Sequence, residues 1–262
     1  MLGNWKFTAF LTFASGFILL FIIAPLAGLF LNTSPPRLSE AINDSAVIGS
    51  IRLTLTSSLL AVLSFGVLSV PLSFLLARKK FFLSNLINGI IDLPLVIPHS
   101  AVGIALLGVL SRGSFLGGAG ESVGISFVGG QAGIVVAMAF VSLPFLINSA
   151  RNGFAAVPER LEKVALNLGA SPLKVFLTIS LPLAKRHIIT GFTMMWARGL
   201  SEFGAVVIIV YHPMVTPVLI WERFTSFGLE HTRPVAAIFV AICLAIFVAM
   251  RLLSRTISHD RG

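Results

Sequence analysis

Two charged residues, four positions apart, interrupt an otherwise apolar stretch near residue 200. At this spacing Arg198 and Glu202 lie on the same face of a helix, so their side chains can form an ion pair. If the stretch crosses a membrane, an unpaired charge there costs about 2.5 kcal/mol or more, so both side chains should face a protein interior or a water-filled cavity. Two interpretations stay open: an ion pair that locks neighbouring helices together, or a contribution to a pore or gate.

A second apolar stretch carries Asp92 and His99 together with Pro94 and Pro98. Asp92 is an acid that can complete a triad with Arg198. His99 is a candidate pore residue, although a lone histidine is more often a hydrogen-bonded structural group. Proline is tolerated in membrane helices where neighbours or water satisfy the freed carbonyl group.

Small residues beside the charged pair are further candidates. Ser201 and Gly204, and also Gly199, can line a narrow path for a substrate. Small residues also let membrane helices pack closely, which is an equally good interpretation.

The chain lacks the residue patterns of several enzyme and cofactor sites. There is no Gly-x-x-x-x-Gly-Lys-Ser/Thr phosphate loop, so the chain carries no sequence pattern for binding ATP and Mg²⁺. No His, Asp or Glu cluster has metal-ligand spacing, and Cys243 is the only cysteine. We therefore predict no catalytic residue, no metal site and no cofactor in the chain itself.

The composition indicates a protein built for lipid surroundings. Apolar residues make up 56% of the 262 residues and charged residues 11%, whereas soluble domains carry roughly 25% charged residues. A soluble fold with so few charges would expose an apolar surface and aggregate. The long uncharged runs exceed the roughly 20 residues that a helix needs to cross a bilayer, and they favour helices over barrel strands.

We predict an all-α integral membrane protein with a single transmembrane domain over residues 1–262. Six membrane-spanning helices are expected at about 7–31, 50–77, 83–111, 132–150, 187–210 and 234–254. With both termini in the cytoplasm, 13 of the 19 Lys and Arg residues lie on the inner side, five on the outer side, and Arg198 within a span. This distribution follows the positive-inside rule, so the net charge of +9 reflects topology and not a nucleic-acid partner.

The segment between the fourth and fifth spans, residues 151–186, is the longest stretch expected on the cytoplasmic side. From Val157 to Leu168 apolar residues recur at the spacing of an amphipathic helix. The charged residues of the opposite face are Glu159, Arg160, Glu162 and Lys163. Pro158 suits the first turn of this helix, and Gly169 suits the position just after its end.

A second helix is expected to follow the first. Ser171 and Pro172 have the residue types of a helix cap and first turn, and Leu181–Pro182 is expected to end this helix. The segment is therefore predicted to form a helix–turn–helix on the inner membrane surface.

This segment resembles the cytoplasmic signature loop of binding-protein-dependent ABC importer permeases. The family pattern is Glu-Ala-Ala, three residues, Gly, nine residues, Ile, one residue, Leu-Pro. The matching residues are Ala165, Gly169, Ile179, Leu181 and Pro182. Lys163 and Val164 occupy the first two positions of the pattern, and Glu162, one place earlier, is the acid that can substitute.

A narrower resemblance covers two apolar stretches. Residues 196–205, Trp-Ala-Arg-Gly-Leu-Ser-Glu-Phe-Gly-Ala, resemble a signature of molybdate, tungstate and sulfate permeases. Residues 92–99, Asp-Leu-Pro-Leu-Val-Ile-Pro-His, resemble the same branch of the family. The resemblance favours molybdate or tungstate over sulfate.

The resemblance implies the permease subunit of an ATP-driven importer in the cell membrane of a prokaryote. Such a subunit acts as a homodimer, joined by two copies of a separate ATPase and an external substrate-binding protein. In the family the first loop helix sits in a groove on the ATPase. The coupling residues implied here are Leu161, Glu162, Val164, Ala165, Leu168, Gly169, Ala170 and Pro182.

Three alternatives remain at this point. A permease for sulfate or another small oxyanion is the nearest. A secondary transporter predicts inverted repeats with broken helices in both halves, and the sequence has no clear repeat. An intramembrane enzyme requires a Ser/His pair at a helix start or paired acids inside a span, and neither pattern is present.

Overall fold

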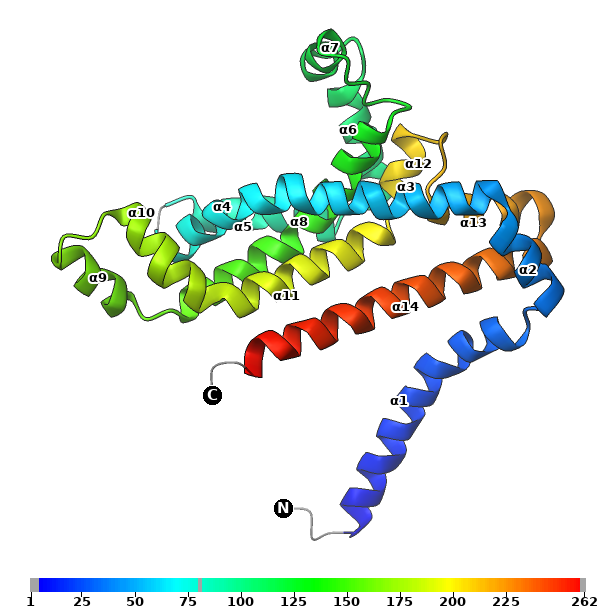
Figure 1. Ribbon diagram of the computed structural model, residues 1–262, viewed down its shortest axis with the longest axis horizontal. Helices are drawn as coiled ribbons and strands as arrows, with labels where there is room; N and C mark the ends of the chain where they lie inside the picture. The colour runs from blue at the N-terminus through cyan, green and yellow to red at the C-terminus, as the bar shows by residue number, and fades with distance from the viewer. Residues whose placement is uncertain (1–4, 80–81, 260–262) are drawn as a thin grey trace. The chain divides into compact units, whose positions relative to one another are not determined.

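The computed structural model describes residues 5–79 and 82–259, and every regular element within these ranges is a helix (Figure 1). In chain order the helices are α1 Trp5–Leu31, α2 Pro35–Asn43, α3 Ser45–Ala61, η1 Val62–Gly66, α4 Val67–Arg78, α5 Ser84–Asp92, η2 Leu93–Leu95, α6 His99–Leu110, α7 Phe115–Ser122, α8 Gln131–Ala156, α9 Glu159–Asn167, α10 Pro172–Val175, η3 Phe176–Ser180, α11 Leu181–Leu200, α12 Gly204–Ile209, α13 Thr216–Phe227 and α14 Leu229–His259. Of the short elements, η1 and η3 are wide π-helical turns and η2 is a narrow 3₁₀ turn. Lys80 and Arg261, which enter the count of inner-side charges, lie outside the described residues.

Four helices in the described part of the chain are long and apolar enough to cross a membrane. They are α1, the continuous helix Ser45–Arg78 made of α3, η1 and α4, then α8, and the Leu229–Met250 part of α14. They coincide with the first, second, fourth and sixth predicted spans. α1 buries no residue within the protein, as suits a helix that is apolar around its whole circumference and faces lipid.

The predicted span at 83–111 is not one helix. The axis bends by 110° between Ser84–Leu95 and α6. The cause is local: neither Pro94 nor Pro98 can donate a backbone hydrogen bond, so a continuous helix loses bonds at both positions. Pro98, with φ of −55° and ψ of 132°, leaves the helical conformation and serves as the N-cap of α6.

The predicted span at 187–210 is also interrupted. α11 ends at Leu200, and α12 begins at Gly204 after a three-residue break. By length and composition the described chain therefore has four candidate spans, or five when the bent pair counts as one. The coarser prediction of an all-helical fold with several apolar spans is confirmed, whereas the count of six is not.

The larger of two compact units covers residues 49–219 and 243–262. In its described part α8 packs along α11 and against α4, and α6 packs against α12 (Figure 1). Glycine permits the close approach of α8 and α11: a Cβ atom at Gly191 would lie 2.8 Å from Leu146 Cδ1, and one at Gly153 would lie 2.5 Å from His187 Cβ. The core side chains that α8 supplies include Ile134, Met138, Leu146 and Phe154.

The smaller unit covers residues 1–48 and 220–242. Two ion pairs join its parts: Arg37 Nη2 lies 2.8 Å from Glu230 Oε1, and Arg223 donates to Asp44. Asp44 Oδ1 also accepts the Ala46 N–H at 2.7 Å, in the first turn of α3. The Arg223 guanidinium beside it holds the pKa of Asp44 below its usual range.

Candidate functional site

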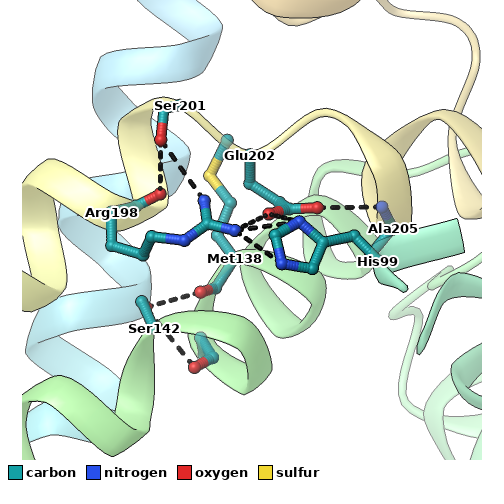
Figure 2. Close-up of polar contacts among 8 residues, drawn as sticks. His99, Met138, Ser142, Arg198, Ser201, Glu202 and Ala205 are labelled. Carbon is teal, nitrogen blue, oxygen red and sulfur yellow. Dashed lines mark hydrogen bonds and ion pairs between the residues drawn. The ribbon is translucent and has the colours of Figure 1, made fainter. Parts of the chain in front are cut away.

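The break between α11 and α12 buries the carboxylate of Glu202 completely. Arg198, one helical turn earlier, donates from Nη2 to Glu202 Oε2 at 2.9 Å, so the predicted ion pair forms. The other oxygen, Oε1, accepts the Ala205 N–H at 2.9 Å. Glu202 lies in the break between the two helices and accepts a backbone N–H in the first turn of α12, satisfying a donor that the helix start leaves free (Figure 2).

His99, the first residue of α6, completes this group. Its Nδ1 lies 3.2 Å from Glu202 Oε2, and Arg198 Nη2 lies 2.9 Å from the ring nitrogens (Figure 2). A guanidinium only donates hydrogen bonds. One tautomer satisfies both contacts: Nδ1–H donates to Glu202, and Nε2 accepts from Arg198. The cluster of His99, Arg198 and Glu202, called the membrane cluster below, thus ties the bend before α6 to the break after α11.

The predicted third member of the group, Asp92, lies elsewhere. It ends α5, and its Oδ1 accepts from Asn148 Nδ2 of α8 at 2.6 Å. Pro94 is buried in η2, and Pro98 is exposed at the start of α6. Asp92, Pro94, Pro98 and His99 therefore lie around one bend. Of these four residues, only His99 has a hydrogen bond to Arg198.

Ser201 and Gly204 lie on either side of Glu202. Ser201 is exposed, and its Oγ accepts from Arg198 Nη1 at 3.3 Å and donates to the Arg198 carbonyl at 3.1 Å (Figure 2). Gly204 lies against α6, where an added Cβ atom would be 2.7 Å from His99 Cβ. The space at Gly204 is thus filled by packing, which supports the packing interpretation at this position.

The 151–186 segment folds as two helical parts. α9 begins after the N-cap Pro158, and Gly169 follows its end with φ of +85°, a conformation that favours glycine. Ser171 Oγ accepts the Lys174 N–H at 3.3 Å and so caps α10, with Pro172 as its first residue. The predicted boundaries of both helices at this turn agree with the structure.

The prediction that Leu181–Pro182 ends the second helix is wrong. The helix continues from α10 through η3 into α11, and Pro182 is exposed in the first turn of α11. The wide turn explains the continuity: the Leu181 N–H donates to the Phe176 carbonyl, five residues back. Such a turn shifts the bonding pattern, so that the missing N–H of proline leaves the helix intact.

The apolar side of α9 is exposed. Leu161 and Val164 are 40% and 57% exposed, and the C-cap residue Leu168 is 83% exposed. The single buried residue of this helix is Glu162, which lies on the charged face of the predicted amphipathic pattern. Of the other coupling candidates, Ala165 and Ala170 are half-buried and Gly169 is exposed.

The reason for this orientation is a pairing that sequence analysis missed. Arg78, at the end of α4, donates from Nη2 to Glu162 Oε1 at 2.7 Å and from Nε to Oε2 at 2.9 Å. Ser180 Oγ donates to the same Oε1 at 2.7 Å. Arg78 Nη2 also donates to the Val157 carbonyl at 3.0 Å. Arg78, Glu162 and Ser180 are called the loop junction below.

Two known transport permeases are similar to the chain in sequence. The chain is 43% identical over 256 residues to the molybdate/tungstate transport system permease protein WtpB of Pyrococcus abyssi, covering 95% of this chain and 97% of that one. It is 28% identical over 241 residues to a protein of Nephroselmis olivacea named as a probable sulfate transport system permease, covering 89% of this chain and 85% of that one.

The fold is also found in a solved importer structure. A chain of a bacterial ABC transporter involved in the import of alginate superposes with a TM-score of 0.75 at 19% identity, covering 97% of this chain and 96% of that one. Residues 69–259, which contain both the membrane cluster and the loop junction, match the family described as binding-protein-dependent transport system inner membrane component. The chain belongs to this family of transport components.

Proposed function

We propose that this protein is the membrane subunit through which an ATP-driven importer moves molybdate or tungstate into a prokaryotic cell. The observation that carries the proposal is the 43% identity to a molybdate/tungstate permease over nearly the full length of both chains. The relative named for sulfate is more distant, at 28%. Sulfate or another small oxyanion is the second candidate, because all these substrates are tetrahedral dianions.

The proposed topology has six spans within one domain, with both termini in the cytoplasm. The two proposed spans that are not single helices are α5 with α6 and α11 with α12. Each is interrupted by residues whose polar groups find partners in the protein, which is how broken helices are tolerated at membrane depth. The excess of Lys and Arg in the proposed cytoplasmic segments supports this orientation.

The proposed assembly is a homodimer of this chain with two ATPase subunits on the cytoplasmic side and an external substrate-binding protein. ATP and Mg²⁺ belong to the ATPase, because the chain has no phosphate loop. No nucleic acid takes part. The exposed apolar residues of α9, Leu161, Val164 and Leu168, support docking into a groove of the ATPase, since an isolated apolar helix face in water is unfavourable.

For the membrane cluster, the contacts support a positioning role. The carboxylate of Glu202 is fully buried, and both of its oxygens are already bonded. Arg198 and Ser201 retain exposure, so they are the residues of this group that can face a passing oxyanion. We therefore assign Glu202, His99 and Gly204 to holding the two breaks together, and Arg198 with Ser201 to the pathway.

Reconstitution tests the function directly. The chain is co-purified with its ATPase, placed in proteoliposomes, and supplied with the binding protein and labelled tungstate. Uptake is expected only with ATP and the binding protein present, and excess molybdate should compete more strongly than excess sulfate. ATP-independent uptake, or ATP hydrolysis by the purified chain alone, contradicts the proposal. Stronger competition by sulfate selects the second candidate.

A further inference from the structure

The helix that is proposed to dock on the ATPase has weak apolar ties to its own chain. Leu161 and Val164 of α9 and its C-cap residue Leu168 are exposed, and Glu162 is the single buried residue of the helix. The backbone leaves the helical conformation at both ends, at Pro158 and at Gly169. The bonds of Glu162 are therefore the strongest side-chain route by which a displacement of α9 can reach the membrane helices.

We infer that Arg78 and Ser180 are positioning residues for coupling, which together with Glu162 carry a displacement of α9 into two membrane helices at once. Arg78 ends the continuous helix Ser45–Arg78, and Ser180 ends the wide turn that begins α11. The inference rests on the proposed function, because it requires an ATPase that moves α9.

The junction has the properties of a stiff link. The Arg78 and Glu162 side chains are 12% and 11% exposed, so solvent screens their attraction little. Both nitrogens on one edge of the guanidinium bond to both carboxylate oxygens, a planar geometry that resists sliding and rotation. The hydroxyl of Ser180 occupies a further site on Oε1.

Aromatic packing supports the junction from the membrane side. The Phe74 ring lies 5.8 Å from the Arg78 guanidinium carbon. The same ring meets Phe154 of α8 edge-on with centroids 5.2 Å apart, and Phe176 of η3 with centroids 4.9 Å apart. These aromatic contacts pack together the end of α4, the end of α8 and the start of η3. The packed region lies beside the Arg78 guanidinium, which binds Glu162.

The two helices that receive the displacement are also linked further along. Trp196 Nε1 of α11 donates to Ser58 Oγ of α3 at 2.9 Å. Arg198, in the same last turn of α11, belongs to the membrane cluster. A movement that enters through Arg78 and Ser180 therefore acts on two elements bonded to each other at the level of the proposed pathway.

The test measures coupling rather than activity alone. In the reconstituted complex, tungstate imported per ATP hydrolysed is compared among wild type, Glu162→Gln, Arg78→Gln and Ser180→Ala. The matched control is Thr178→Val, which removes an exposed hydroxyl of the same wide turn that donates to the Lys174 carbonyl. Glu162→Gln and Arg78→Gln should lower the ratio about fivefold or more while ATP hydrolysis persists. Ser180→Ala should lower it less, and Thr178→Val should leave it unchanged.

The outcomes separate this inference from the proposed function. If the wild-type complex shows no ATP-dependent uptake, the proposed function fails. If wild type transports and the variants lose uptake and hydrolysis in parallel, with an unchanged ratio, the junction is merely structural and the inference is overturned. If Glu162→Gln and Arg78→Gln do not assemble with the ATPase, the Ser180→Ala variant decides, because removing one hydroxyl keeps the Arg78–Glu162 ion pair. A lowered ratio of tungstate imported to ATP hydrolysed in Ser180→Ala then supports the inference, and a wild-type ratio overturns it.

Discussion

The membrane cluster and the loop junction are both built on a buried Arg–Glu pair, yet they hold the chain together in different ways. Arg198 and Glu202 lie four residues apart and meet across one helical turn. Arg78 and Glu162 lie 84 residues apart in the sequence. Their contact joins the end of α4 to α9. The first pair stabilises a break within the membrane part of the chain, and the second attaches an otherwise exposed helix to it.

The two acids differ in what they bind besides their arginine. The arginines that would lose their partner are both partly exposed, Arg198 by 21% and Arg78 by 12%, so water can reach either one. The fully buried Glu202 also accepts the Ala205 N–H at the start of α12, and this backbone group cannot turn to another acceptor. The Ser180 hydroxyl, whose hydrogen bond Glu162 accepts, can rotate. Loss of either acid should therefore be harmful, and loss of Glu202 should be the more harmful.

Replacing Glu202 with alanine is expected to have the largest effect. The change leaves Arg198 without its acceptor and frees the Ala205 N–H, and breaking one side of a buried pair costs about 3–5 kcal/mol. The melting temperature in detergent, followed by size-exclusion chromatography of heated samples, should fall strongly. The double variant Glu202→Ala with Arg198→Ala should recover part of the loss. A double variant no more stable than the single one would show that the unpaired charge is not the cause.

Replacing Glu162 with alanine should come second. The change removes the acceptor of Arg78 and of the Ser180 hydroxyl, and the loss of hydrogen bonds to a charged group costs about 1.5–3 kcal/mol, but it leaves the backbone hydrogen bonds of α9 in place. The same melting experiment should show a smaller decrease than for Glu202→Ala. Glu159→Ala on the same helix is the control, because its carboxylate pairs with Lys163 at the surface, where such pairs contribute about 1 kcal/mol or less. Equal losses for Glu162 and Glu159 would contradict the assignment of a buried junction.

The contrast between the two pairs also explains what the sequence could predict. The Arg198–Glu202 pair followed from helical spacing, and the caps at Gly169 and Ser171 followed from local residue preferences. These are short-range features, since the partners are within four residues of each other. Long apolar runs likewise identified the four continuous spans, because the length needed to cross a bilayer is a local property.

Features that depend on distant contacts could not be predicted. The amphipathic pattern placed Glu162 on the charged face of its helix, and nothing within that helix indicates Arg78 as a partner. His99 rather than Asp92 reached Arg198 because the bend at Pro94 and Pro98 aims α6 at the α11–α12 break. In the wide turn before Pro182 the backbone hydrogen bonds change from the α-helical to the π-helical pattern. Residue preferences do not reveal such a change. A positive charge at the end of a span, as at Arg78, was the one available signal.

Replacing Gly204 with alanine tests how tightly the two broken helices meet. An added Cβ atom would lie 2.7 Å from His99 Cβ, so the helices must separate slightly, and such overpacking costs about 1–3 kcal/mol. The melting temperature should fall. Gly108→Ala in α6 is a matched control, because nothing lies within 4 Å of a Cβ atom there and alanine is the better helix former. It should leave stability equal or slightly raised, and a loss as large as for Gly204 would contradict close packing as the cause.

The ion pair of Asp44 and Arg223 provides a more exposed comparison with both buried pairs and should show the smallest effect. Arg223 donates to Asp44 and holds its pKa below the usual value of about 3.9. The stabilisation is therefore complete above about pH 4 and is lost as the pH falls through the lowered pKa of the folded state, because the unfolded chain binds the proton first. Melting temperatures measured from about pH 6 down to about pH 3 should fall more steeply for wild type than for Asp44→Asn. Glu121→Gln, which removes the exposed pair with Arg112, is the control and should follow wild type. Parallel curves of melting temperature against pH for wild type and Asp44→Asn would mean that the Asp44–Arg223 pair adds no stability. Burial, rather than pairing alone, would then separate the strong ion pairs of this chain from the weak ones.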